Sequence, residues 1–314
     1  MDRLRTLRLF CRIVELGSFS SAARGLGLPS ATASTWMKSL ENSLGVRLLE
    51  RSTRKVAVTA EGRAYYERVN NILQDLDEVD ESLRADGAEL AGRVKIALTG
   101  HIMRGVVLPF LPAFTEAHPK LDLSFTMADR PVDLLTENVD LAIRLGTLSN
   151  SSLLAKQLAS FRLVTLATRE LAASAPADPR TLRPEQTIGY RYPPPRDEAG
   201  LPFRFNRDGE RFEIPLAGRI QFDEFDTCID AAQAGLGYIQ VLWCQAHDAI
   251  RRGSLVPVYL DWADVFSPVS LLSLERKNRP RRVEGVMEWL VDIFAKTAAI
   301  CEQEIEQARA NPPG

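Results

Sequence analysis

The chain has no long hydrophobic run, and it lacks the short motifs of the common enzyme classes. No stretch of about 18 consecutive uncharged apolar residues occurs, which excludes an ordinary membrane-spanning helix. The first eight residues carry charged side chains throughout, so they lack the apolar core of a secretion signal. We therefore expect a cytoplasmic protein with no membrane partner.

Histidine and cysteine are scarce and scattered. The three histidines stand far apart, and no two have the spacing of metal ligands. The four cysteines form no CxxC pair, and we interpret them as reduced, buried residues, with a redox pair of Cys228 and Cys244 as the alternative. GxSxG, HExxH, P-loop and GxGxxG motifs are all missing. These absences predict a protein that is not an enzyme and that holds no metal and no cofactor.

Charge is distributed unevenly along the 314 residues, which are enough for two or three hydrophobic cores. Residues 1–64 hold eleven Lys or Arg and five acidic residues, a net charge of +6, whereas the whole chain has a net charge of −2. Residues 65–90 hold two basic and eight acidic residues, a net charge of −6. A basic first segment on a neutral or acidic body is typical of a DNA-binding module. A randomly charged surface is the alternative interpretation.

The first segment is predicted to form three helices. Apolar residues at helical spacing predict a helix over 3–16, and Gly17 and Ser18 end it and begin a second helix over 19–25. A turn at Pro29 precedes a third helix over 30–43, whose N-terminal half would enter the major groove. The alternative is that the polar residues of this helix form only a solvated face. The candidate base contacts are Ser30, Thr32, Ser34, Thr35 and Lys38.

Two short strands with a basic turn between them follow, which predicts a wing at residues 47–58. Basic side chains of such a wing lie on the DNA backbone or in the minor groove. The candidates are Arg51, Arg54 and Lys55, although Arg51 could instead pair with Glu41 or Glu50.

A long helix is expected next, with Thr59 as its cap. Apolar residues then alternate spacings of four and three, which favours a coiled coil between two copies of the chain. A helix lying on the surface of the C-terminal domain is the alternative. The predicted dimer seam is Tyr65, Val69, Ile72, Leu76, Val79 and Leu83.

The remainder alternates strand and helix patterns. Strands over 93–98, 121–126 and 139–144, with helices over 103–117 and 131–137, predict a mainly parallel sheet. Apolar runs at 161–168 and 267–274 bracket a middle region, for which we predict strands 219–222 and 238–241 and a helix over 225–234.

Residues 4–63 resemble the N-terminus of LysR-type transcriptional regulators. The shared motif elements are Phe10, Gly17, Ser18, Phe19, Ala22, Ala23, Leu26, Ser34, Leu40, Glu41, Leu44, Gly45, Leu48, Arg51, Thr59 and Gly62. The chain departs from the family at residues 29–32, where Ser-Gln-Pro-Ala is common, and at Thr35, where Arg is usual. The resemblance continues more loosely in residues 139–144, 234–237 and 253–258.

The resemblance implies an α/β fold of three parts. These are a winged helix-turn-helix domain at residues 1–59, a linker and dimerisation helix at 60–90, and an effector domain at 91–314. The effector domain is expected to have the two-lobed, periplasmic-binding-protein-like (type 2) fold, with lobe one at 91–160 and 267–300 and lobe two at 161–266.

The function implied is that of a sequence-specific transcriptional regulator controlled by a small molecule, a carboxylate or an aromatic compound, bound between the lobes. Its implied partners are double-stranded DNA, the effector, RNA polymerase and further copies of the chain in a homodimer or homotetramer. An effector-independent architectural DNA-binding protein and a solute-binding protein are the alternatives.

Effectors of α/β domains bind beyond the carboxyl ends of strands and near helix N-termini. By that rule the candidate contacts are Thr99, Gly100, His101, Met127, Asp129, Arg144, Tyr190, Phe222 and Phe225. Thr99 with nearby amides would suit a carboxylate, and Arg144 would supply the counter-charge. Arg144 could instead pair with an aspartate, His101 could be a capped surface residue, and the two phenylalanines could belong to the core.

Overall fold

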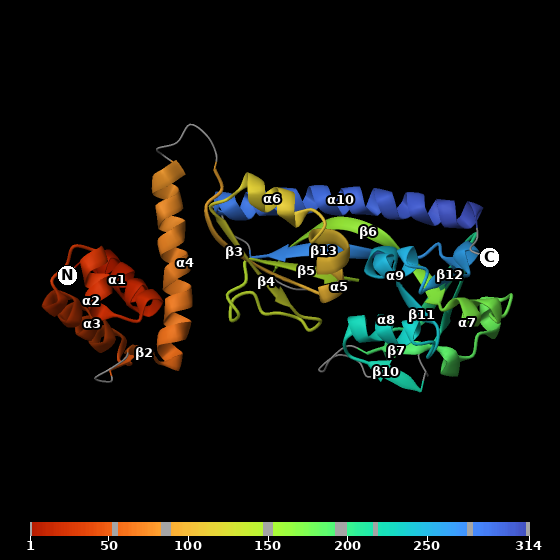
Figure 1. Cartoon of the computed structure of the whole chain (residues 1–314), viewed down its shortest axis with the longest axis horizontal. Coiled ribbons are helices and arrows are strands. Elements are labelled where there is room, and N and C mark those ends of the chain that lie inside the picture. Colours follow the sequence, from red (N-terminus) through yellow and green to blue (C-terminus); the bar gives the residue numbers. More distant parts are fainter. Residues whose placement is uncertain are drawn as a thin grey trace. The chain divides into compact units, whose positions relative to one another are not determined.

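The computed structural model describes residues 2–51, 56–82, 89–146, 153–191, 200–215, 219–274 and 279–311 of the chain. They divide into two compact units, Met1–Arg93 and Val94–Gly314, and each unit is described by itself (Figure 1). No helix among these residues combines the length and the apolar character that crossing a membrane requires.

Within the described residues, the first unit contains four helices and a two-stranded wing, as the sequence predicts. The elements are α1 (Arg3–Leu16), α2 (Phe19–Gly25), α3 (Ser30–Leu44), β1 (Leu49–Arg51), β2 (Val56–Val58) and α4 (Ala60–Ser82). Gly17 ends α1 with φ of 60°, a left-handed conformation that glycine adopts without steric cost. The Ser18 hydroxyl then accepts a hydrogen bond from the Ser21 amide and begins α2.

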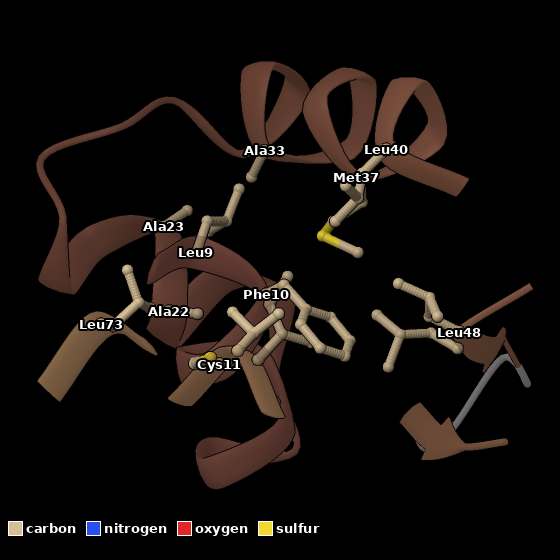
Figure 2. Packing of buried hydrophobic residues seen from close by; sticks show 13 residues of the cluster. Leu9, Phe10, Cys11, Ala22, Ala23, Ala33, Met37, Leu40, Leu48 and Leu73 are labelled. Atoms are coloured by element: carbon tan, nitrogen blue, oxygen red, sulfur yellow. The ribbon is translucent and has the colours of Figure 1, made fainter. Parts of the chain in front are cut away.

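One hydrophobic core joins the helices of this unit. Figure 2 shows Phe10 of α1, Met37 and Leu40 of α3, and Leu73 of α4 within the same cluster. Ala22, Ala23 and Ala33 are fully buried, and their small side chains let α1, α2 and α3 approach closely. Because α4 contributes Val69 and Leu73, it packs on its own chain over at least its first half.

The second unit is a mixed α/β structure. Its main strands are β3 (Gly92–Leu98), β4 (Leu121–Met127), β5 (Leu141–Leu145), β6 (Leu154–Ala167), β11 (Ile239–Leu242), β12 (Val256–Val258) and β13 (Phe266–Ser273). They form one seven-stranded sheet in the order β11-β6-β13-β5-β3-β4, in which β12 also pairs with β6. Smaller pairs are made by β7 (Ile188–Tyr190) with β10 (Ile220–Phe222) and by β8 (Phe203–Arg207) with β9 (Glu210–Ile214).

The second unit also contains helices. They are α5 (Gly100–Ile102), α6 (Leu111–Ala117), α7 (Arg169–Ala173), α8 (Phe225–Gln233), α9 (His247–Arg251) and α10 (Arg281–Ala310). Figure 1 shows α10 running along the sheet. Phe294 of α10 meets Phe161 of β6 edge to face, with 6.3 Å between ring centroids. The buried Arg162 side chain of β6 also donates to the Glu302 carboxylate of α10.

Three expectations for this unit were wrong. The sheet is not mainly parallel, because β13 is antiparallel to β5 and β6, and β11 and β12 are antiparallel to β6. The helix expected over 103–117 is interrupted, since residues 103–107 form a π-helical turn before α6 begins at Leu111. No helix forms over residues 131–137, where residues 134–138 form turns. In addition, β6 runs without a break across the expected lobe boundary at residue 160.

The cysteines are buried free thiols. Burial, reinforced by the carboxylates of Glu224 and Asp129, raises the pKa of the Cys228 thiol to about 12. Because the thiolate is the reactive form, this environment supports the interpretation of Cys228 as a small core residue.

Candidate functional site

The first candidate site is the outer face of α3. Ser30, Thr35 and Lys38 are exposed, whereas Thr32 and Ser34 are partly buried. Residues three and four apart share a helix face, so Ser34, Thr35 and Lys38 present hydroxyl groups and one cation together. The Thr35 hydroxyl donates to the Ala31 carbonyl oxygen at 3.1 Å, which leaves its oxygen lone pairs as acceptors.

The opposite face of α3 is fixed by the core and by the wing. Ala33, Met37 and Leu40 are buried in the core. The Glu41 carboxylate accepts hydrogen bonds from the backbone amides of Leu48 at 2.8 Å and Leu49 at 3.1 Å. These hydrogen bonds connect α3 to the first wing strand. The Glu41 side chain therefore has backbone partners, whereas the sequence had also allowed an ion pair between Glu41 and Arg51.

The wing itself is a short antiparallel ladder in which Leu49 pairs with Val58 and Arg51 with Val56. Only the backbone of Arg51 is described, and the predicted contacts Arg54 and Lys55 lie outside the described residues. Pro29 stands at the N-cap position just before α3, and its side chain makes no capping hydrogen bond with the first-turn amides.

The apolar side chains of α4 divide between two neighbouring faces. Val69 and Leu73 are 4% and 5% exposed in the core of the first unit, and the Tyr65 ring lies 5.6 Å from the Phe10 ring. Ile72 is 62% exposed and Leu76 is 36% exposed. The predicted seam must therefore be corrected at Val69, which is buried within its own chain. Tyr65 also packs against this core but is only partly buried, so its place in the seam stays a prediction. The side chain of Val79 and the whole of Leu83 lie outside the described residues.

The sequence pattern places these positions on one stripe because a heptad alternates steps of four and three. A straight α-helix turns 100° per residue, so its apolar positions drift around the axis. Leu73, which the seam omitted, belongs to the buried face. Leu73 stands four residues after Val69, and residues four apart share a helix face, so this spacing could have placed Leu73 beside Val69.

The second candidate site is a cavity of about 450 Å³ in the second unit. Six of the nine predicted effector contacts line it: Thr99, His101, Asp129, Arg144, Tyr190 and Phe225. The other three, Gly100, Met127 and Phe222, are not part of the lining. A Cβ added to Gly100 would stand 2.7 Å from Asp226 Oδ2, and Met127 is 48% exposed at the end of β4.

Several lining residues were missed. Cys228, Gln240, Gln245 and Ser267 add polar atoms, and the apolar walls include Val132, Leu163, Ile188, Phe203, Ile239, Leu242 and Leu272. Most of them follow or lie on β6, β11 and β13, whose pairings join segments about 70 to 120 residues apart. A rule based on strand ends alone could not place them.

One end of the cavity is polar and deeply buried. His101 is 3% exposed, and its Nε2 lies 2.9 Å from the Thr99 hydroxyl oxygen. Burial, helped by the Arg104 cation, lowers the pKa of His101 to about 3, so the ring is neutral near pH 7. Its Nδ1 atom is buried and has no hydrogen-bond partner among the described residues. The alternative of a capped surface histidine is therefore wrong.

Aromatic rings continue this end of the cavity. The Phe225 ring lies 5.0 Å from His101 and 4.7 Å from Tyr190, measured between ring centroids. Phe225 begins α8, and its amide donates to Asp129 Oδ2 at 3.2 Å. The carboxylate that follows β4 is thereby held at the start of α8.

Acidic groups dominate the electrostatics around Phe225. Burial raises the pKa of the Asp129 carboxyl, and the carboxylates of Glu224 and Asp226 add to that rise, while the Arg144 cation opposes it. Asp226 forms an ion pair with Arg104. Arg144 donates from Nη1 to the Ala128 carbonyl oxygen at 3.5 Å.

The comparisons with known proteins cover both units. Residues 4–63 match the bacterial regulatory helix-turn-helix proteins of the lysR family, and residues 87–295 match the LysR substrate binding domain. The chain is 32% identical over 304 residues to an HTH-type transcriptional repressor of Pseudomonas aeruginosa, covering 96% of this chain and 95% of that protein. It is 27% identical to the HTH-type transcriptional activator AaeR of Escherichia coli, covering 96% and 97% of the two chains.

Solved structures agree with these matches. CrgA, a LysR-type transcriptional regulator from Neisseria meningitidis, aligns with a TM-score of 0.57 and 25% identity. The alignment covers 92% of this chain and 98% of CrgA.

Proposed function

The chain belongs to the LysR family of DNA-binding transcriptional regulators, and we propose that it reads its operator with the exposed face of α3. In this proposal Ser34, Thr35 and Lys38 contact base edges or phosphates. Hydroxyl groups suit either donors or acceptors of the bases, and a lysine reaches guanine or phosphate. The supporting residues are Ser30 and Thr32 at the start of α3 and Arg51, Arg54 and Lys55 in the wing.

The observation that carries this proposal is the contrast between the two faces of α3. Ala33, Met37 and Leu40 are buried, whereas Thr35 and Lys38 are exposed. The uncapped first turn of α3 adds amides that suit a phosphate oxygen. Thr35 replaces the arginine that is usual in the family, so we expect an operator with different base preferences.

We further propose that the cavity of the second unit holds a small-molecule effector, between the two lobes whose boundaries the sequence suggests. The apolar and aromatic walls support a ligand with an apolar or aromatic body. This favours an effector-controlled regulator over an architectural DNA-binding protein. Control of transcription would further require contact with RNA polymerase, in the cytoplasm where the DNA lies.

The exposed Ile72 and Leu76 of α4 support self-association of the chain as a homodimer or homotetramer. Two copies related by a two-fold axis would read two half-sites, so the operator should be an inverted repeat.

Selection of genomic fragments by the purified chain, followed by sequencing, tests the proposal. The wild-type chain should enrich one inverted-repeat sequence, and a Ser34→Ala/Lys38→Ala variant should lose that enrichment. The matched control is Lys296→Ala, an exposed lysine on α10 that pairs with Asp292. Equal enrichment by the wild-type chain and the α3 variant would show that another surface reads the DNA.

A further inference from the structure

The polar end of the cavity offers a buried hydrogen-bonding atom that has no partner among the residues the structure describes. His101 lines this end, its side chain is 3% exposed, and no described group bonds to its Nδ1 atom. A buried polar atom without a hydrogen bond costs free energy comparable to a lost hydrogen bond. A ligand that supplies the missing hydrogen bond would recover that free energy.

The hydrogen-bond role of Nδ1 depends on Thr99. If the Thr99 hydroxyl donates to Nε2, then Nδ1 carries the proton and donates; if Nε2 donates to Thr99, then Nδ1 accepts. A hydroxyl group on the ligand satisfies both cases, because it donates and accepts. A carboxylate satisfies only the first case, and an ammonium only the second.

Electrostatics also select against a carboxylate. The charged groups that the structure places around Phe225 are the acids Asp129, Glu224 and Asp226 and the cations Arg104 and Arg144. Around Phe225 the acids outnumber the cations; the cavity lining as a whole holds Asp129, Arg144 and Arg204, and Arg204 pairs with Glu213. The amide at the start of α8 already donates to Asp129. The helix at Thr99 has only three residues before the π-helical turn, so it gives an anion little support.

An ammonium is disfavoured for a different reason. It would lose its hydration in a buried site where Asp226 already pairs with Arg104 and Asp129 already accepts from the Phe225 amide. A hydroxyl costs much less to bury when it is hydrogen-bonded. The apolar walls and the Tyr190 and Phe225 rings suit a flat or compact apolar body.

We propose that the cavity selects an effector with an apolar or aromatic body and an uncharged hydroxyl head that hydrogen-bonds to Nδ1 of His101. The inference rests on the proposed function, in which this cavity holds the effector. It narrows the two classes that the sequence suggested, a carboxylate or an aromatic compound, to a neutral aromatic or aliphatic alcohol or phenol.

Four probes with one phenyl ring and one further carbon test the head group: benzyl alcohol, benzoate, benzylamine and toluene. Their dissociation constants for the full chain can be measured by calorimetric titration. Benzyl alcohol should bind at least about tenfold more tightly than the other three, because one satisfied buried hydrogen bond contributes about that factor. A preference for benzoate or benzylamine, or no binding by any of the four, would overturn the proposal.

Two variants assign the preference to named groups. His101→Leu should bind benzyl alcohol and toluene about equally. Asp129→Asn keeps the shape but removes a negative charge, so benzoate should gain about tenfold relative to benzyl alcohol. His118→Gln, which alters a histidine outside the cavity lining, is the control and should keep the wild-type order. If His101→Leu still preferred benzyl alcohol to toluene as the wild type does, the role of His101 would be contradicted.

Fluorescence anisotropy with operator DNA separates the two levels of failure. If the chain binds its operator DNA normally but prefers benzoate, the proposed function stands and only the hydroxyl head group is contradicted. If the chain does not bind DNA, the proposed function is contradicted, whichever of the four probes binds most tightly.

Discussion

Gly62 lies against the backbone of Leu48: a Cβ added to Gly62 would stand 2.0 Å from the Leu48 carbonyl oxygen. This close approach joins the start of α4 to the entry of the wing. The Thr59 hydroxyl strengthens the same junction, since it accepts the Gly62 amide at 2.9 Å and donates to the Arg47 carbonyl oxygen at 2.8 Å.

Gly62→Ala should therefore destabilise the first unit by about 1–3 kcal/mol, because the backbone of Leu48 must move. Urea unfolding followed by circular dichroism measures the change. The matched control is Gly25→Ala in α2, where an added Cβ meets nothing within 4 Å. That control should be neutral or stabilising by up to about 1 kcal/mol. Equal effects of the two substitutions would contradict the importance of the Gly62 packing.

Substitutions at Val69 and Ile72 should separate folding from self-association. Val69→Ala removes a buried side chain and should cost about 1–3 kcal/mol of unfolding free energy. Ile72→Ala changes a side chain that is 62% exposed, so it should leave the stability of the unit nearly unchanged and weaken self-association. Sedimentation velocity over a range of concentrations measures the second effect. If Ile72→Ala kept the wild-type association constant, the α4 face would not be the interface.

Much of the first unit was predictable because its determinants are local. The periodicity of residues 3–16, the cap at Ser18 and the motif around Leu48 each lie within a few residues of the element that they specify. The seam on α4 was harder, because the sequence pattern of Val69 and Ile72 is the same whether the side chain meets its own chain or another copy. Only the packing of α1 against α4 separates the two faces.

The second unit was less predictable because its contacts are long-range. Strand β6 pairs with β13, and Val269 of β13 lies opposite Ala159, which no local pattern indicates. Thr99 and Asp129 were found because they stand just beyond the ends of β3 and β4, and Arg144 because it stands near the end of β5. Gln240 and Ser267 were missed, since their position depends on pairing between distant segments.

Glu41→Ala should weaken both stability and DNA binding. It removes the acceptor of the Leu48 and Leu49 amides and should cost about 1–3 kcal/mol, the typical penalty of leaving buried donors unsatisfied. Glu41→Gln keeps an acceptor oxygen, so we expect it to recover most of that stability. Thermal unfolding and operator binding of both variants give the comparison. If glutamine were no better than alanine, the two amide hydrogen bonds would not explain the role of Glu41.

His101 should make the second unit less stable in acid. Its folded pKa of about 3 lies below the unfolded value of 6.5, so the unfolded chain binds more protons between these two values. Stability is therefore fully present above the unfolded pKa and declines as pH falls toward the folded one. From pH 7 to pH 5 this group alone should lower the unfolding free energy by about 2 kcal/mol.

Urea unfolding of His101→Gln and of the wild-type chain at pH 7 and pH 5 measures that contribution. The decrease for the wild type should exceed the decrease for the variant by about 2 kcal/mol, and His118→Gln should behave as the wild type does. Identical decreases in the wild type and His101→Gln would contradict a buried neutral histidine.

The most direct test of the central claim is the salt dependence of operator binding, measured by fluorescence anisotropy on the DNA upstream of the chain's own gene. The wild-type chain should bind tightly and lose affinity steeply with salt, because its cations release counterions from phosphates. Lys38→Ala should weaken binding and reduce the slope of log K against log salt by about 1 if its ammonium binds a phosphate, while Lys296→Ala should change neither quantity. Lys38→Ala binding with the wild-type affinity and slope would contradict the account that α3 reads the DNA.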